Sequence, residues 1–564
     1  MKKTIALLLC IVMLFAMTAC ADKTGDSKPA DAPKEDTSGT TNEEVEAPEE
    51  EKVELDFLAP SYIYIEDYAT NEMTLWMEER TGVHVNWSTI PDQTQAQEEK
   101  LTMLLASNEL PDVFMGCAIS DAMISRYGVE EGLFLPLEDL IEEHMENFKV
   151  SIAKFNGGVD LLRSIDGHIY SLPVLDKCHH CEHASKVWLY DPWMQKLGLD
   201  YPETTEDFYN VLKAFKEQDP NGNGEADEIP FVASDSGWHN NVDEFLMNSF
   251  LYYDRYSRGG NINGFYVKDG VIENSIIQDE YREGVRFIKR LYQDGLLYEG
   301  SLTQASEQIV KLVENEDIPI VGAVTGGWTG MFADFGGERA EGYHPIAPLV
   351  GPEGVQIAPT YPSRPNLGEY VLAADCTNPE AAVKYADELY TMEASLNIRA
   401  GGMEGNFWQR GEDGQVSFEG EQAVWMQLKP WDDKEPQNES WIAVGVWDYV
   451  DLRANQAIKE EAMENMWSAA GLEYMLYTKT MEDYVPVALD YSLPTLNFTA
   501  EEQEQLATLE TDVNNYYRSA QFNFITGNLD LDADWEKYLA DLEKAGVSKI
   551  KELYQTAYDR QFKQ

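Results

Sequence analysis

The stretch Val53–Ile90 reads VELDFLAPSYIYIEDYATNEMTLWMEERTGVHVNWSTI, and it decides the fold class. Its first eight residues, VELDFLAP, predict a short buried strand, and VHVNWSTI at its end predicts a second one. The segment between them, NEMTLWMEERTG, predicts a helix that stops at a glycine. A predicted helix over 95–106 and a third strand in LPDVFMG (Leu110–Gly116) follow. Strands that alternate with helices at this spacing predict an α/β fold, with a parallel sheet covered by helices.

A second series of strands and helices starts at KVWLYDPW (Lys186–Trp193). Its helix over 205–218 carries a capping box that begins at Thr204. IPIVGAV (Ile318–Val324) predicts a buried strand, the proline-rich residues 345–365 predict an extended crossing, and the tail after Asp451 is mostly helical. The roughly 510 residues after the N-terminal region exceed what one core usually holds, so at least two lobes are expected.

The N-terminal residues predict export from the cytoplasm. Lys2 and Lys3 precede an apolar run that ends shortly before Cys20, which indicates a signal peptide over 1–19. A cysteine at this place resembles bacterial lipoprotein signals, so we expect lipid on Cys20 and a position at the extracellular face of the cell membrane. Cleavage nearby to give a secreted protein is the alternative. Residues 20–52 lack aromatic side chains and predict a disordered acidic tether.

Charge and cysteine content exclude several classes of function. A formal net charge of −59 disfavours nucleic acid, whose phosphates need Lys and Arg, and it also disfavours long anionic ligands. The simplest interpretation of this acidity is that the negative charge keeps the protein soluble. Four cysteines follow Cys20, which is enough for two disulfides outside the cell, and the pairing of Cys117 and Cys376 stays open.

The segment DPNGNGEADEIP (Asp219–Pro230) predicts a calcium site. Its spacing follows the first half of an EF-hand loop, with a glycine at the sixth position, although the twelfth position is proline instead of glutamate. We expect the carbonyl of Glu225 and the side chains of five further residues to bind Ca²⁺: Asp219, Asn221, Asn223, Asp227 and Glu228. The alternative is a solvated turn rich in Asx residues.

This loop resembles the calcium site of the family 1 extracellular solute-binding proteins, especially the large alginate-binding and LipO-like lipoproteins of sugar ABC importers. DGHIYSLP (Asp166–Pro173), the segment Tyr190–Lys216 and VGAVTGGW (Val321–Trp328) carry the same resemblance. It implies a two-lobed periplasmic-binding-protein-like fold of type II, with a hinge between the lobes and a structural role for the ion. Lobe 1 is expected to comprise 53–172 and 345–395. Lobe 2 is expected to comprise 173–344 and 396–564, including the calcium loop 219–228.

Aromatic and planar polar side chains near the cleft are the expected ligand contacts, because sugars combine apolar faces with hydroxyl edges. The resemblance places Trp328 and the Trp238–His239 pair at such positions. The remaining candidates are Trp408, Tyr62, Tyr64 and Arg364. One of Trp425, Trp431, Trp441 and Trp447 could join them, although the sequence does not say which.

CHHCEH (Cys178–His183) lies outside the family pattern. A Cys178–Cys181 disulfide is the leading interpretation, and zinc bound by the cysteines and histidines, or free thiols, are the alternatives.

The expected function is therefore that of a monomeric, non-catalytic lipoprotein that captures an oligosaccharide and delivers it to the membrane subunits of an ABC permease. The main alternative is an extracellular hydrolase, either zinc-dependent through His179, His180 and His183 or carbohydrate-active through two carboxylates. No HExxH or GxSxG motif is present in the sequence. A structural surface protein or adhesin is a weaker possibility.

Overall fold

The computed structural model describes residues 53–563 except 93, 108, 156, 256–263, 316–317, 335, 430–435, 443 and 449–451. The expected signal peptide, tether and lipidated Cys20 lie outside the described residues. None of the described helices is long and apolar enough to span a bilayer.

The predicted βαβ unit begins the first sheet. β1 (Val53–Pro60) pairs in parallel with β2 (Val83–Ile90) and β3 (Val113–Met115), and β12 (Asn366–Leu372) is antiparallel to β3 and to β4 (Leu172–Val174). The order is β2-β1-β3-β12-β4. Phe57 and Leu58 belong to different core clusters, because successive side chains of a strand point to opposite faces. Both faces of this sheet are therefore covered.

Helices close both sides of this first sheet. α1 (Glu72–Thr81) and α12 (Pro379–Leu389) contribute to the cluster that contains Phe57, whereas α2 (Thr94–Ser107) contributes Leu101 and Leu105 to the other cluster. Gly82 ends α1 in the left-handed conformation, as the sequence predicted. The shorter helices of this region are α3 (Asp121–Met123), α4 (Glu138–His144), α5 (Glu146–Ile152) and α13 (Met392–Arg399).

The second sheet has the order β10-β5-β9-β6. β6 (Ile229–Val232) and β9 (Val321–Thr325) are parallel, and β5 (Val187–Tyr190) is antiparallel to β9 and to β10 (Tyr343–Pro345). Leu189 and Trp188 again enter separate clusters. The flanking helices are α6 (Asp191–Leu197), α7 (Thr205–Glu217), α8 (Val242–Met247), α9 (Asp279–Gln293), α10 (Ser306–Val313), α11 (Glu338–Glu341), α14 (Glu460–Glu464) and α15 (Leu472–Lys479).

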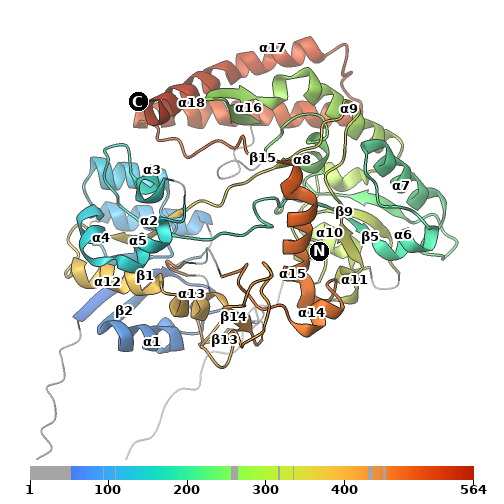
Figure 1. The fold of residues 1–564 in the computed structure, drawn as a ribbon. Coiled ribbons are helices and arrows are strands. Elements are labelled where there is room, and N and C mark those ends of the chain that lie inside the picture. Colours follow the sequence, from blue (N-terminus) through green and yellow to red (C-terminus); the bar gives the residue numbers. More distant parts are fainter. Residues whose placement is uncertain are drawn as a thin grey trace, which may run out of the picture. The chain divides into compact units, whose positions relative to one another are not determined.

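The helical C-terminal part packs with the second sheet (Figure 1). α16 (Ala500–Thr526), α17 (Trp535–Ala545) and α18 (Val547–Phe562) bury Tyr517, Tyr538 and Tyr554 in the core that also holds Leu189. Short paired strands complete the fold: β7 (Phe265–Lys268) with β8 (Val271–Asn274), β11 (Ala358–Pro359) with β15 (Ala488–Leu489), and β13 (Trp408–Arg410) with β14 (Trp425–Gln427). The expected α/β class with sheets flanked by helices is confirmed.

The chain passes between the two sheets in separate crossing segments, and residues 52–564 group as one compact unit. The first crossing, residues 175–186, joins β4 to β5, and the second crossing, residues 360–365, leads from β11 to β12. Among the described residues of 398–452, Trp425, Trp441 and Trp447 pack in the core of the first sheet. This packing differs from the sequence boundary, which assigned everything after 395 to lobe 2.

Candidate functional site

Two tryptophans stand at the carboxyl ends of neighbouring parallel strands. β6 and β9 pair with Phe231 opposite Ala323, and the loops that follow them carry Trp238 and Trp328. The loops touch, because the N–H of Gly327 donates to the carbonyl of Trp238 over 3.2 Å. A Cβ at residue 327 would lie 2.3 Å from the indole of Trp238, so glycine is required there. The two partly exposed indoles therefore come from loops that lie side by side.

Trp238 leads directly into a buried network. His239 adopts φ +59°, a left-handed conformation that only a few per cent of non-glycine residues take. Its Nδ1 lies 2.8 Å from Oε1 of Glu244, and the Tyr361 hydroxyl donates to the same oxygen. Glu244 is 1% exposed, and its Oε2 has no hydrogen-bond partner among the described residues. The network thus joins the loop after β6 to the second crossing.

A pocket of about 440 Å³ opens beside Tyr361. One wall is formed by Arg364 of the second crossing and Asn366 at the start of β12, and the loop after β3 forms another. Ala118 in that loop also has a positive φ of 46°. Asp254 contributes a carboxylate from the second lobe, and Nη2 of Arg364 donates to Oγ of Ser492 over 3.0 Å. Both lobes and the crossing therefore supply polar groups to one pocket.

A second carboxylate, Glu369, is buried on β12 close to this pocket. Its Oε1 accepts a hydrogen bond of 2.6 Å from Nδ2 of Asn366, which lines the pocket. Burial raises the pKa of Glu369 to about 7. Burial and then the charge of Glu369 raise the pKa of Tyr62, which lies in the loop after β1. Tyr62, which the sequence predicts as a ligand contact, therefore lies close enough to Glu369 for the charge of this carboxylate to act on it.

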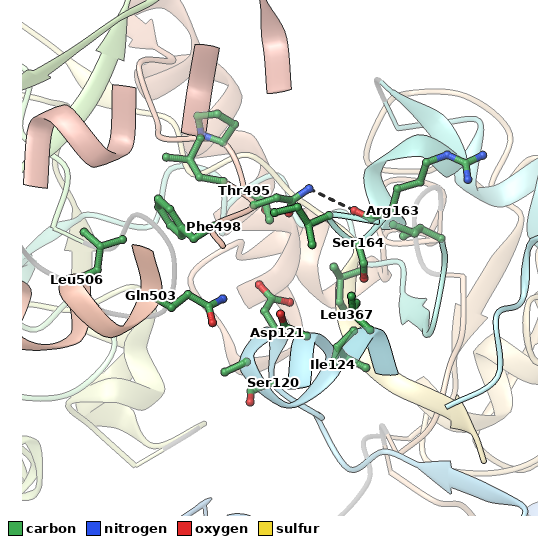
Figure 2. A pocket seen from close by; sticks show the side chains of 18 of the residues that line it. Ser120, Asp121, Ile124, Arg163, Ser164, Leu367, Thr495, Phe498, Gln503 and Leu506 are labelled. Atoms are coloured by element: carbon green, nitrogen blue, oxygen red, sulfur yellow. Dashed lines mark hydrogen bonds between the residues drawn. The ribbon is translucent and has the colours of Figure 1, made fainter. Parts of the chain in front are cut away.

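A larger cavity of about 620 Å³ adjoins the pocket (Figure 2). The two share the lining residues Ser120, Asp121, Leu367, Leu493 and Thr495. Phe498 and Gln503 line the cavity from the C-terminal part, and in Figure 2 the side chains of Gln503 and Asp121 point toward one another. Nδ2 of Asn497 donates to the carbonyl of Arg163 over 3.3 Å across it. The pocket and the cavity are therefore adjacent, and we call the two together the cleft.

The structure brings some of the predicted ligand residues together and separates others. Arg364 lines the pocket, and His239 reaches it through Glu244 and Tyr361. Trp408 does not line the pocket. It is fully buried in the core of the first sheet, where its Nε1 donates to Oδ1 of Asn397. The prediction that Trp408 contacts a ligand is corrected accordingly.

The other uncertain tryptophans and Tyr64 lie elsewhere. Trp425, Trp441 and Trp447 are core residues of the first sheet, and Trp431 lies outside the described residues. Tyr64 lies in the loop after β1, where its carbonyl accepts from the N–H of Gln437. Sequence reasoning missed Tyr361, Glu244, Asp254 and Glu369. Only Tyr361 had a signal in the sequence, because it lies within the proline-rich stretch that predicted a crossing.

The calcium loop connects α7 to β6 in a tight turn. Asp219, with φ +46°, accepts hydrogen bonds from the N–H groups of Gly222 and Gly224. Asn221 and Asn223 each donate to a different oxygen of Asp227 at 2.9 Å. Oε1 of Glu228 is buried without a hydrogen-bond partner in the part of the chain that the structure describes.

Electrostatics favour a cation in this loop. Burial and the charges of Asp227 and Asp219 raise the pKa of Glu228, which means that its carboxylate is poorly compensated. The donors are hard oxygens, which suit Ca²⁺. The residues present therefore fit the ion that the sequence predicts.

The CHHCEH turn lies in the first crossing. The structure joins Cys178 and Cys181 by a disulfide, whereas Cys117 and Cys376 are buried and free. Burial lowers the pKa of His183 to about 4 and that of Lys186, whose Nζ donates to the carbonyls of His180 and His183, to about 7.

Comparison with known proteins identifies related chains. A family model described as bacterial extracellular solute-binding protein matches residues 60–395. The fructooligosaccharide ABC transporter substrate-binding protein FusA of Streptococcus pneumoniae serotype 4 is 28% identical over 560 residues, which cover 97% of each chain. Lipoprotein LipO of Bacillus subtilis is 26% identical over 222 residues, which cover 39% of this chain and 40% of LipO.

Solved structures of FusA have the same fold. The complex of S. pneumoniae FusA with kestose superposes with a TM-score of 0.66 at 25% identity, covering 90% of this chain and 99% of FusA. An EF-hand mutant of FusA in complex with fructo-nystose gives a TM-score of 0.67 at 24% identity, with the same coverage.

Proposed function

Because this chain belongs to the bacterial extracellular solute-binding protein family, we propose that it captures an oligosaccharide in the cleft and delivers it to an ABC permease. The name of FusA, which is related over nearly the whole chain, supports both the ligand class and the transporter. In this proposal the ligand is released unaltered, so the protein is not an enzyme.

The observation that carries this proposal is that the pocket and the larger cavity share five lining residues and so lie side by side. Volumes of about 440 and 620 Å³ each lie in the range of sites for drug-sized ligands, so two adjacent sites of this size suit a chain of several sugar units. Arg364 and Asn366 can orient hydroxyl groups at the crossing, while Phe498 offers an apolar face farther along.

The charges of the cleft favour a neutral sugar. Asp121 and Asp254 line the pocket, and the buried Glu369 lies beside it, whereas Arg364 is the cation among the pocket's lining residues. Carboxylates accept hydrogen bonds from sugar hydroxyls but repel uronates. The net charge of −59 acts in the same direction. We therefore expect a neutral oligosaccharide.

We also propose that Ca²⁺ occupies the 219–228 loop and stabilises the second lobe without touching the sugar. The buried, unpartnered Oε1 of Glu228 and the oxygen donors around it support this assignment. The FusA structure that is described as an EF-hand mutant indicates that this relative also carries such a loop.

The remaining parts of the proposal concern location and lobe boundaries. We propose a monomer anchored by lipid on Cys20 to the extracellular face of the membrane, with the resemblance to LipO as support.

We further propose that lobe 1 consists of 53–174, 366–395 and 396–452, because Trp425, Trp441 and Trp447 pack on its core. Lobe 2 then consists of 187–359 and the residues after 452.

Calorimetric titration with a length series of neutral oligosaccharides tests this function. The series begins with kestose and nystose and is set against oligogalacturonate of matched length. We expect affinity to rise with the number of neutral units until the cleft is filled, no binding of the uronate, and unchanged sugar on recovery. New reducing ends would identify a hydrolase instead.

Variants in the larger cavity test whether the ligand extends there. Phe498→Ala or Gln503→Ala should weaken binding of the longest ligand about fivefold, a loss of about 1 kcal/mol, and leave kestose unaffected. Phe522→Ala, which removes an exposed ring from α16, is the matched control. Equal losses for short and long ligands would place the whole sugar in the smaller pocket.

A further inference from the structure

The CHHCEH turn in the first crossing contains a potential metal ligand, His180, in addition to the two cysteines of the disulfide. A nitrogen of His180 and the sulfurs of Cys178 and Cys181 all lie within 4.8 Å of one another. Nε2 of His180 is 3.8 Å from Sγ of Cys181. Zinc bonds of about 2.3 Å to sulfur and 2.0 Å to nitrogen in a tetrahedral site place such atoms roughly 3.5 Å apart. The distance of 3.8 Å between Nε2 of His180 and Sγ of Cys181 is therefore close to the separation of two ligands of one ion.

The hydrogen bonding of His180 is incomplete. The residue is 8% exposed, and its Nδ1 is buried without a hydrogen-bond partner among the described residues. Its Nε2 faces only a sulfur, which is a weak hydrogen-bond partner. Buried polar groups in proteins almost always find a partner, so an imidazole whose two nitrogens are this weakly satisfied is a place where an ion, a water molecule or a ligand can bind. The imidazole is thus available to a metal.

The turn is held in place from the second crossing. The carbonyl of Glu182 accepts from the N–H of Tyr361 over 2.8 Å, and its Oε1 accepts from the N–H of Ser363 over 3.0 Å. Oγ of Ser363 in turn accepts a hydrogen bond of 3.4 Å from the N–H of Cys178. These contacts fix both ends of the turn, so reduction of the disulfide leaves the three side chains near one another.

We propose that the reduced turn binds a thiophilic d¹⁰ cation, Zn²⁺ or Cu⁺, through Cys178, Cys181 and His180. Two thiolates and one imidazole are ligands that such ions prefer, and water or an external ligand completes the coordination.

The chemistry requires a reductant. A dithiol transfers two electrons and two protons to the Cys178–Cys181 bond, which becomes two thiols while the dithiol becomes a disulfide. The cation then displaces one proton from each thiol to solvent and forms two metal–sulfur bonds. An external disulfide reverses the step: it accepts two electrons from the two metal-bound thiolates and becomes two thiolates itself, while the metal is released and the Cys178–Cys181 bond forms again. The first crossing therefore has two alternative covalent states, the disulfide and the metal-bound dithiolate. In each state the hydrogen bond from the N–H of Tyr361 to the carbonyl of Glu182 links the turn to the cleft.

Cobalt titration of the full mature protein tests this inference. The protein is reduced anaerobically with a phosphine, freed of excess reductant and titrated with Co²⁺. We expect one equivalent to give a thiolate-to-cobalt charge-transfer band and visible d–d bands, both removed by Zn²⁺. The oxidised protein and the Cys178→Ser/Cys181→Ser variant should give neither band. The calcium loop has only oxygen ligands, so cobalt bound there cannot produce the thiolate band.

His180→Ala separates a three-ligand site from two reactive thiols. It should retain both thiols in a labelling assay but weaken Co²⁺ binding at least tenfold, whereas His84→Ala, which changes an exposed side chain of β2, should bind as the wild type does. Circular dichroism verifies that each variant is folded. Absence of the charge-transfer band in the reduced wild type, resistance of the disulfide to reduction in the folded protein, or an unchanged titration of His180→Ala would each overturn the proposal.

Discussion

Nδ1 of His239 lies 2.8 Å from Oε1 of Glu244, and this buried contact fixes the loop that presents Trp238. The same carboxylate oxygen accepts the hydroxyl of Tyr361 on the second crossing. Because Glu244 is almost fully buried, it joins the second lobe to the crossing in a place where water does not compete.

Removal of Glu244 should therefore affect both ligand binding and stability. We expect Glu244→Ala to weaken the best-binding oligosaccharide at least tenfold and to lower stability by about 3 kcal/mol, because it breaks a buried charged network. Calorimetry and urea unfolding measure the two effects. Tyr361→Phe, which removes one hydroxyl only, should have the smaller effect on both. Wild-type affinity in Glu244→Ala would show that the network does not shape the site.

Trp238 and Trp408 should respond in opposite ways to truncation. Trp408→Ala empties a fully buried site and is expected to cost about 3–5 kcal/mol of stability, while the folded fraction binds with unchanged affinity. Trp238→Ala is expected to lose about tenfold in affinity with a smaller stability cost, because its ring is partly exposed and the adjacent His239 contacts Tyr361 of the pocket. Titrations below the melting temperature and urea unfolding distinguish the two residues. A loss of affinity in folded Trp408→Ala would return that residue to the site.

Removal of calcium should destabilise the second lobe. A cation present at 100 times its dissociation constant stabilises the folded state by about 2.7 kcal/mol, so a chelator should lower the melting temperature of the wild type by a few degrees. Glu228→Gln should melt lower at the outset and show no response to chelator.

Glu225→Gln is the matched control for this experiment, since it removes the same charge from the same loop, where only the backbone carbonyl is assigned to the ion. It should respond to chelator as the wild type does. A wild-type melting curve that chelator leaves unchanged would contradict the calcium assignment.

Glu369 should make stability depend on pH. Its folded-state pKa of about 7 lies above its ordinary value of 4.5, so the folded protein holds an extra proton between these values. Stability should fall as pH rises from about 4.5 to about 7, by an amount on the order of 3 kcal/mol for full ionisation. Glu369→Gln has no such proton and should lack this contribution. Urea unfolding of both proteins across this range measures the difference, and parallel curves would contradict the prediction.

Local patterns were sufficient for much of the fold. The alternation of Phe57 and Leu58 between two core clusters follows from the period of a strand, and Gly82 ends its helix because glycine tolerates the left-handed conformation. The capping box at Thr204 is present as predicted, since it depends on residues only three positions apart. Each of these features is decided by neighbours in the chain.

Residues of the cleft were predicted less well. Arg364 was identified because it lies in a recognisable crossing, but Trp408 was chosen from its place after a glycine-rich loop and lies in the core. Glu244 and Glu369 gave no signal, because in a chain with 101 acidic residues no single carboxylate stands out.

The sequence by itself determined the α/β class, the composition of the calcium loop and the close spacing of Cys178 and Cys181, because each depends on short-range periodicity or spacing. Only the tertiary structure decided that Tyr361, Asp254 and Ala118 surround one pocket, and that Trp425, Trp441 and Trp447 pack on the first sheet. Burial and long-range pairing depend on how the whole chain excludes water, which no local stretch encodes.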